Sequence, residues 1–341
     1  MMSLRAFTMC LQPPRFFTHL HKVSSRLVSI GLLIWASLHS STHAADIAIL
    51  KSAEVSYYDE AVEGFRAALP PRTSIEEFHL HGNLQRGREV GKALRVESPR
   101  LVFAVGLKAA LAAKLELPDV PIIFGLVLDP ETHGLPTANM TGIRMRMRAS
   151  QQLETLRTLL PTAQRIGVLY NTDKNKGFIA DAHRHAQRAG LELIAEKVES
   201  PTDVPDAIRV MLPKVHALWL IQDPTVVTDL SATFLLQASL DAKVPVFTFS
   251  STLVQQGALG ALVVQAGEVG QQAAYLSSQM LRGQSIPAAN LIEPERPQLT
   301  LNLHTAQYLG VTVSQDTLRT ASVLFGPGAL ARERQLPDTV R

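Results

Sequence analysis

Arg165-Ile-Gly-Val-Leu-Tyr170 is a short apolar run, and it closely matches the run with which the body of the chain begins, Asp46-Ile-Ala-Ile-Leu-Lys51. Both runs have the length and the β-branched content of buried strands. Each is followed by a segment whose apolar residues recur at helical spacing, for example Phe65 and Leu69 after the first run. The repetition predicts two similar halves in one chain.

Outward from these two runs, each half alternates predicted strands with predicted helices. The strands expected in the first half are 46–51, 73–79, 100–105 and 120–125, with helices at 58–69, 84–98 and 107–117. The strands expected in the second half are 165–170, 191–198, 217–221 and 244–249, with helices at 151–160, 176–189, 204–212 and 228–241. Strand–helix–strand order predicts an α/β protein whose parallel sheets are covered on both faces. The later strands 260–264 and 298–302 and the later helices 268–281 and 304–309 could complete either half.

Residues 1–44 are predicted to be a secretory signal peptide. Basic residues but no acidic residue occur within residues 1–45, and the apolar run 27–38 is shorter than the roughly 20 residues that span a bilayer. Small side chains at Thr42 and Ala44 are typical of a cleavage site. We therefore expect cleavage near Ala44 and a periplasmic mature protein, the alternative being a leader that is kept as an anchor.

Composition excludes several classes of function. Arg5, Arg15, Lys22 and Arg26 lie in the leader, so the 33 basic residues of the chain fall to 29 against 30 acidic residues, which gives no electrostatic reason to expect a nucleic-acid partner. Because Cys10 is the only cysteine, the mature chain would contain no disulfide, thiolate metal site or cysteine nucleophile.

Enzymatic signatures are missing from the sequence. There is no Gly-X-Gly-X-X-Gly, Walker-type loop or Gly-X-Ser-X-Gly, and the carboxylates are scattered. The histidine pairs 79/81 and 183/185 lack the i, i+4 spacing that suits a shared metal on a helix. We therefore expect no metal, no cofactor and no catalytic activity, and a hydrolase or isomerase that uses a cleft between the halves is the least favoured alternative.

Several motifs resemble those of one known family. Pro121-Ile-Ile-Phe-Gly-Leu-Val-Leu-Asp129-Pro130 is followed by Gly134-Leu135 and Asn139-Met-Thr-Gly142, and similar strands, Asp-Pro turns and Asn-X-Thr-Gly motifs occur at this spacing in that family. Further matches bring the resemblance to residues 47–321: Pro161 with 165–171, Gly257-Ala258, 270–274, Leu301-Asn302, Ala306 and Leu309-Gly310. The chain is similar to the substrate-binding proteins of ABC transporters with the type I periplasmic binding protein fold, in the family that includes tryptophan- and phenylalanine-binding members.

This resemblance implies two Rossmann-like lobes with parallel sheets, joined by a three-crossing hinge. The implied boundaries are 46–142 plus 265–295 for lobe 1, 143–264 plus 296–322 for lobe 2, and 323–341 for a flexible tail. A small polar, amino-acid-like ligand would be captured between the lobes of a monomer and presented to an ABC permease in the inner membrane. The alternative is a sensory module that signals to a membrane receptor or kinase.

Two departures weaken the transfer of an aromatic amino acid as ligand. Many family members carry a His-Pro pair shortly after the first strand, where this chain has Ala53-Glu-Val-Ser-Tyr-Tyr58. Many members also carry an Asp before the late helix, where this chain has Gln265.

The carboxyl ends of the predicted strands supply the candidate ligand-binding residues, because ligands of open parallel sheets bind there and helix N-termini at this edge attract anions. In the first half the candidates are Lys51, Ser52, Tyr57, Gly106, Lys108, Gly125 and Asp129. Later in the chain they are Asn171, Thr172, Asp223, Thr225, Ser250, Ser251 and Gln265. Lysines would bind an anionic group, Asp223 an ammonium group and Tyr57 an apolar group by stacking.

Each candidate also has a purely structural interpretation. Ser52, Thr172, Thr225 and Ser250 could simply cap helices. Gly106 could permit a tight strand–helix turn, with close ligand approach as a second role. Asp129 and Asp223 precede prolines and could form ordinary turns. Tyr58 could stack on a ligand or begin the buried face of a helix.

The run Ile143-Arg-Met-Arg-Met-Arg148 alternates apolar and basic residues, which predicts a strand with its arginines on one face. We expect that face to be solvated, and an anion-binding rim beside the first crossing between the lobes is the alternative.

Overall fold

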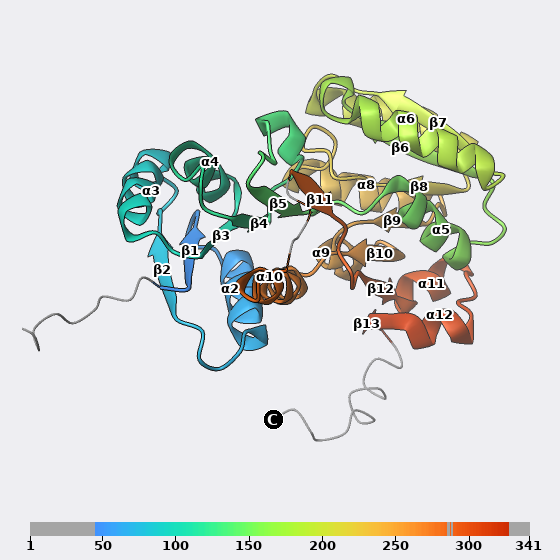
Figure 1. Cartoon of the computed structure of the whole chain (residues 1–341). Helices are drawn as coiled ribbons and strands as arrows, with labels where there is room; N and C mark the ends of the chain where they lie inside the picture. The colour runs from blue at the N-terminus through green and yellow to red at the C-terminus, as the bar shows by residue number, and fades with distance from the viewer. Residues whose placement is uncertain (1–44, 285–286, 288, 327–341) are drawn as a thin grey trace, which may run out of the picture. The chain divides into compact units, whose positions relative to one another are not determined.

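The computed structural model describes residues 45–284, 287 and 289–326 (Figure 1). The predicted signal peptide, and residues 327–341 of the predicted tail, lie outside this part of the chain. Among the described residues, no helix has the combination of length and apolar character that crossing a membrane requires.

The first sheet, sheet A, is parallel throughout in the described part of the chain. Its order is β11 (Asn290–Ile292), β5 (Met140–Ile143), β4 (Ile122–Gly125), β3 (Leu101–Val105), β1 (Ile47–Lys51) and β2 (Ile75–His79). The helices packed on it are α2 (Ser56–Ala68), α3 (Leu84–Glu97), α4 (Leu107–Glu116) and α10 (Ala266–Leu281). A short 3₁₀ helix, η1 (Pro130–His133), follows β4.

The second sheet, sheet B, is parallel except for the antiparallel pair β10–β12. Its order is β13 (Ala321–Phe325), β12 (Gln298–Asn302), β10 (Gly260–Val263), β9 (Val246–Thr248), β8 (Ala217–Trp219), β6 (Arg165–Tyr170) and β7 (Glu192–Lys197). Its helices are α5 (Ala149–Leu159), α6 (Thr172–Arg188), α7 (Val204–Met211), α8 (Asp229–Asp241), α9 (Ser251–Gln255), α11 (Leu303–Leu309) and α12 (Gln315–Thr320), with 3₁₀ turns η2 (Pro201–Asp203) and η3 (Leu212–Lys214). The predicted α/β class with two parallel sheets is confirmed, apart from this antiparallel pair.

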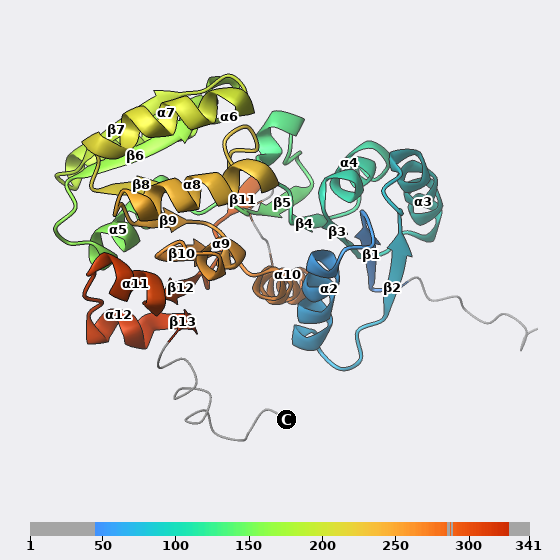
Figure 2. The ribbon, with the colours of Figure 1, turned by 180° about the vertical axis from the view of Figure 1, so that it is seen from behind.

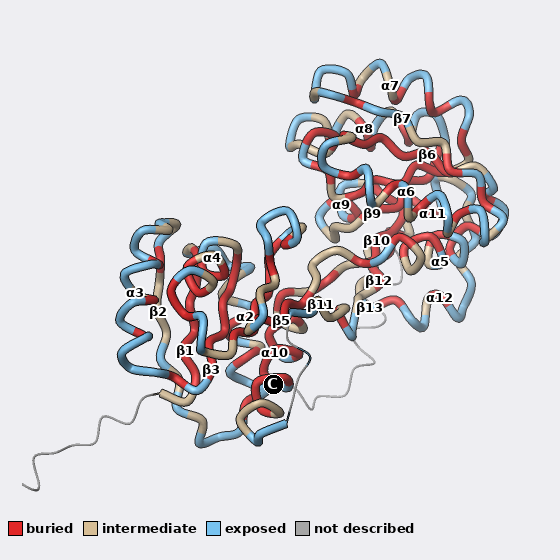
Figure 3. Tube along the Cα trace, turned by 45° about the horizontal axis from the view of Figure 1, so that its top comes forward, coloured by how far each residue is buried: buried red, intermediate tan, exposed pale blue. Residues whose placement is uncertain are grey.

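Burial explains why the central strands are uniformly apolar instead of alternating. In β1, Ile47 and Ile49 pack with Phe65 of α2, whereas Ala48 and Leu50 belong to a separate cluster with the alanines of α4. Figure 3 shows the same continuous burial along the central strands, such as β1 and β3, but not along the edge strand β2. Each sheet therefore has helices on both faces, and every side chain of a central strand contacts one layer or the other.

Helix α10 comes late in the sequence but packs against α2 beside sheet A, and the two helices lie side by side in both views (Figures 1 and 2). Glycines make this contact close. A Cβ atom on Gly270 would lie 2.8 Å from the backbone nitrogen of Phe65, and one on Gly64 would lie 2.9 Å from the Cα atom of Gly267. Larger residues at these positions would push the helices apart.

The described chain passes between the two sheets three times. The passages run from β5 to α5, from β10 to α10 and from β11 to β12. We call them the first, second and third crossing segments.

Two predicted segments differ from the structure. The prediction of a strand over 143–148 was wrong, because β5 ends at Ile143 and residues 144–148 leave the sheet as the first crossing segment. Its neighbour β11 ends at Ile292, whose carbonyl oxygen accepts a bond from the Arg144 nitrogen, and beyond this point the segment has no β11 ladder to join. At the other end of the chain, β13 includes residues 323–325, the start of the predicted tail.

Candidate functional site

A cavity of about 530 Å³ lies at the carboxyl ends of strands from both sheets, and we call it the strand-end cavity. Leu126 and Leu128 follow β4, Gln222 follows β8, and Phe249 follows β9. The remaining walls come from the start of α2, the start of α9, and the first and second crossing segments. Its volume is typical of sites that hold small organic ligands.

The lining of the strand-end cavity is apolar and neutral-polar. Aromatic rings come from Tyr57, Tyr58 and Phe249, thioethers from Met145 and Met147, and hydroxyl or amide groups from Gln152, Gln222, Ser250, Ser251, Thr252 and Gln265. Among the described residues, Glu60 carries the only acidic or basic side chain in this lining. Such a surface suits a ligand with a substantial apolar or aromatic part.

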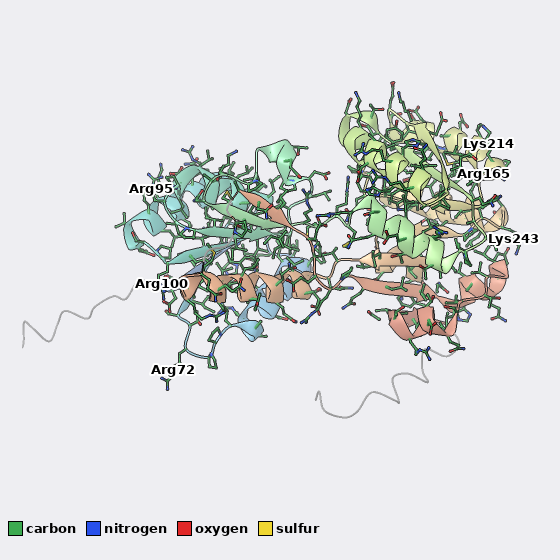
Figure 4. The ribbon with its side chains drawn as sticks, turned by 45° about the vertical axis from the view of Figure 1, so that its right-hand side comes forward. Arg72, Arg95, Arg100, Arg165, Lys214 and Lys243 are labelled. Carbon is green, nitrogen blue, oxygen red and sulfur yellow. The ribbon has the colours of Figure 1, made fainter. Side chains whose placement is uncertain are left out.

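Three cationic side chains lie at the other ends of strands of sheet B. Arg165 begins β6, while Lys214 and Lys243 shortly precede β8 and β9, and Figure 4 shows all three at the outer side of sheet B. Arg165 Nε donates to the Lys214 carbonyl oxygen at 2.5 Å. These charges are therefore placed away from the strand-end cavity.

Tyr57 is fixed by the second crossing segment. Its hydroxyl donates to the carbonyl oxygen of Val264 at 2.9 Å, although the residue as a whole is 38% exposed. Burial of the phenol, reinforced by the charge of Glu60, raises the pKa of Tyr57 to about 12. Tyr57 therefore lines the cavity as a neutral ring whose hydroxyl is already bonded.

Tyr58 covers the ends of β1 and β3. Gly106 has φ of +85°, and a Cβ atom on it would lie 2.7 Å from the Tyr58 hydroxyl oxygen and 2.8 Å from Ser52 Oγ. Ser52 is buried, and its Oγ accepts from the Ala109 nitrogen at 2.9 Å, so it caps α4 from a neighbouring strand. Neither Gly106 nor Ser52 lines the strand-end cavity, whereas Tyr58 does.

Lys51 is neutralised by nearby carboxylates. Its ammonium lies 2.5 Å from Asp59 and 2.9 Å from Glu54, and the residue is 4% exposed. Burial alone would lower the pKa of Lys51, but the hydrogen bonds that its ammonium donates to Asp59 and Glu54 raise the pKa above its ordinary value. The cation is committed to these partners and does not line the strand-end cavity.

Asp223 organises a buried network beneath the carboxyl ends of sheet B. Its carboxylate accepts from the backbone nitrogen of Asn171 at 2.6 Å, from Asn175 Nδ2 at 2.6 Å and from the backbone nitrogen of Thr225 at 2.9 Å. The Asn171 side chain caps α6 through the nitrogen of Asp173, and Thr225 Oγ1 accepts from Lys174. This carboxylate is 2% exposed and already holds three donors.

The other candidates fall into two groups. Tyr57, Ser250, Ser251 and Gln265 line the strand-end cavity; Ser250 precedes α9 without a side-chain capping bond, and Ser251 Oγ lies 3.1 Å from Thr300 Oγ1. Lys108, Gly125, Asp129 and Thr172 do not line it. Lys108 donates to the Gly82 carbonyl oxygen, a Cβ on Gly125 would lie 2.8 Å from a Val269 methyl group, and Thr172 begins α6.

The arginines of the first crossing segment line a different cavity, of about 610 Å³, together with Asp129 and Glu131. Arg144 pairs with Glu131 at 2.8 Å and with Glu293 at 3.3 Å, and Arg148 pairs with Glu293 at 2.9 Å. Arg146 is the most buried of the three, with 12% of its side chain exposed. The arginines of this segment were expected to face solvent. In the structure they also face carboxylates.

A third cavity of about 630 Å³ borders the outer side of α10 and the third crossing segment, with Tyr275 and Arg296 in its wall. It is slightly larger than the strand-end cavity but is built mainly from one helix. The strand-end cavity is the better candidate site because open parallel sheets place ligands at their carboxyl edges.

Sequence reasoning from polar loops missed most of the apolar wall. Leu126, Leu128 and Phe249 follow the ends of their strands, while Met145 and Met147 lie in the first crossing segment. Large apolar residues just past a strand end were the available signal, although Leu126 also belongs to the buried core.

Comparison with known proteins places the chain in a family. The model for the ABC transporter substrate binding protein family matches residues 46–324. A curated relative, a tyrosine-binding protein of Clostridioides difficile, is 23% identical over 290 residues, covering 80% of this chain and 84% of the relative.

Solved structures share the fold. A ligand-free, open substrate-binding protein with adhesive properties from Clostridium difficile aligns with a TM-score of 0.71 and 21% identity, covering 82% of this chain and 98% of the other. An ABC domain from Streptococcus pneumoniae in complex with L-Trp aligns with a TM-score of 0.57 and 24% identity, covering 82% and 99%. The resemblance that the sequence motifs predicted is confirmed, and this chain belongs to the family of ABC transporter substrate-binding proteins.

Proposed function

We propose that the protein is exported to the periplasm, captures an amino-acid-like solute with an apolar or aromatic side chain in the strand-end cavity, and delivers it to an ABC permease. The observation that carries this proposal is the cavity itself, whose walls come from the carboxyl ends of both sheets and from the crossing segments. A ligand that touches both sheets would stabilise the arrangement in which both walls contact it.

The chemistry of the walls supports this ligand class. Tyr57, Tyr58 and Phe249 offer rings for stacking, while Gln222, Ser250 and Thr252 offer neutral hydrogen-bonding groups for a polar head. The tyrosine-binding relative and the L-Trp complex point to the same class.

Isothermal titration calorimetry of the purified protein with L-tyrosine, L-tryptophan, L-leucine, L-alanine and D-glucose tests the ligand class. We expect saturable binding of at least one amino acid and none of D-glucose. Phe249→Ala should weaken that binding about tenfold or more, the equivalent of about 1.4 kcal/mol. The control Tyr275→Ala, a 56% exposed residue on α10, should leave the Kd unchanged. Binding of no amino acid at millimolar concentration would refute this ligand class.

Export has its own test. Mass spectrometry of the protein recovered from the periplasmic fraction should give a mature chain that begins at Ala45. A chain that retains residues 1–44 and sediments with the membrane would show that the leader acts as an anchor.

A further inference from the structure

Two adjacent tyrosines differ in what their hydroxyl groups do. Tyr57 donates its hydroxyl to the Val264 carbonyl oxygen and is thereby fixed to the second crossing segment. The Tyr58 hydroxyl forms no hydrogen bond with another residue in the described part of the chain, although burial raises the pKa of Tyr58 above its ordinary value. Packing, and not a hydrogen bond of its hydroxyl, therefore holds the Tyr58 ring in place.

The position of the Tyr58 ring decides how deep the strand-end cavity is on the sheet A side. Its hydroxyl oxygen and its Cζ atom would each lie 2.7 Å from a Cβ atom on Gly106, so the end of the phenol rests on the glycine backbone. Ser52 Oγ borders the same point at 2.8 Å. Gly106 and Ser52 stand at the carboxyl ends of β3 and β1, yet the cavity stops at Tyr58.

Gly106 therefore leaves room for a group at the end of β3, and a side chain of the protein itself fills that room. Without the phenol, the space next to Gly106 and Ser52 would be continuous with the strand-end cavity. A ligand could then extend to the ends of both strands.

We propose that Tyr58 is the residue that sets ligand size in this protein, by closing the space beside Gly106. The role in ligand selection rests on the proposed capture function, whereas the filling of the space can be tested separately. The ring excludes long or wide side chains from the sheet A wall.

The test compares Tyr58→Ala, Tyr58→Leu and Tyr58→Phe with the wild-type protein. Calorimetry gives Kd values for L-tryptophan and L-alanine, and thermal unfolding is followed with and without millimolar 4-methylphenol, an analogue of the removed side chain. Tyr58→Leu keeps an apolar residue against the core and serves if Tyr58→Ala does not fold. Tyr275→Ala is the control for loss of an aromatic ring elsewhere on the protein.

We expect the ratio of the Kd for L-tryptophan to the Kd for L-alanine to fall about tenfold or more in Tyr58→Ala, and by less in Tyr58→Leu. Tyr58→Phe should keep the wild-type ratio because its ring fills the same space. 4-Methylphenol should raise the Tm of Tyr58→Ala by more than it raises the wild-type Tm.

Folded variants that keep the wild-type Kd ratio and respond to 4-methylphenol no more than the wild type does would overturn the assignment of Tyr58. A different result separates the two proposals. If no protein binds an amino acid but 4-methylphenol stabilises Tyr58→Ala more than the wild type, the amino-acid ligand class is refuted, while the closure of this space by Tyr58 is supported.

Discussion

Arg146 Nη1 donates a hydrogen bond to Oδ1 of Asn175 at 2.7 Å, which joins the first crossing segment to helix α6 of sheet B. The same guanidinium donates to the Gln222 carbonyl oxygen at 2.5 Å, lies 3.5 Å from Asp129 after β4, and stacks 4.9 Å from the centre of the Phe178 ring. Burial lowers the pKa of Arg146 from its ordinary value, and the charge of Asp129 counteracts this effect. One arginine of the crossing segment thus bonds to groups that follow strands of both sheets.

Replacing Arg146 with Met should destabilise the protein by about 1–3 kcal/mol, because it leaves acceptors on the buried Asn175 and the half-buried Gln222 without their donor. Urea unfolding of wild type and variant measures the difference. The matched control is Arg148→Met, since Arg148 is 64% exposed and its pair with Glu293 should contribute at most about 1 kcal/mol. Equal losses in the two variants would contradict the special role of Arg146.

Asp223→Asn should cost about 1–3 kcal/mol, because an amide nitrogen would replace one of the oxygens that accept from Asn171, Asn175 and Thr225. Hydrogen exchange should also show faster opening at the start of α6, whose cap belongs to the same network. The exposed Asp241→Asn is the control and should change stability by no more than about 0.5 kcal/mol. A folded Asp223→Asn protein of wild-type stability would show that this network does not hold the loop.

The fold could be predicted from the sequence because the same strand–helix pattern occurs in both halves of the chain. Two matching runs, at 46–51 and 165–170, and the strand–helix alternation after each, predict two parallel sheets. The prediction of a strand over 143–148 was wrong for a physical reason. The alternation of Met and Arg indicates which side chains are buried, but burial does not require a strand. Met147 is buried although it lies in a crossing segment outside either sheet.

The candidate site was harder to predict, because the distance between polar groups depends on packing that a pattern does not contain. Lys51 follows the expected strand, yet its charge is held by Asp59 and Glu54, carboxylates that lie in the next loop and helix. Gly106 was expected to allow either a turn or a ligand, and the structure places the Tyr58 ring against it. The sequence could predict the strand ends and some residues that line the cavity there, such as Tyr57 and Ser250. Whether the other candidates reach the cavity depends on their partners in the folded chain.

Low pH should reduce the free energy of unfolding in part through Glu116, which lies at the end of α4. Arg88 Nε donates to Glu116 at 2.7 Å, and this hydrogen bond lowers the pKa of Glu116 from its ordinary value near 4.5. A carboxyl whose pKa is lower in the folded protein stabilises it above the ordinary value, and that contribution disappears as the pH falls through the lowered pKa.

The stability difference between wild type and Glu116→Gln, measured by urea unfolding from pH 7 to pH 3, should therefore be largest near neutral pH and shrink below about pH 4.5. Glu89→Gln is the control, because Glu89 is exposed on α3 and forms no ion pair with another described residue. A difference that stays constant over this range would contradict the assignment of the pH dependence to Glu116.

Replacement by Ala should have opposite effects at two helical glycines, one at the contact between α2 and α10 and one on the exposed face of α6. Gly270→Ala places a methyl group against Ala61 and Phe65 of α2, and overpacking of this kind costs about 1–3 kcal/mol. Gly177→Ala adds the same methyl group to exposed α6, where nothing lies within 4 Å, and should stabilise the protein by about 0.5–1 kcal/mol through helix propensity. Thermal and urea unfolding of the two variants measure both signs. If Gly270→Ala proved as stable as Gly177→Ala, the close approach of α10 to α2 would not depend on glycine, and the packing that places the late helix on sheet A would need another explanation.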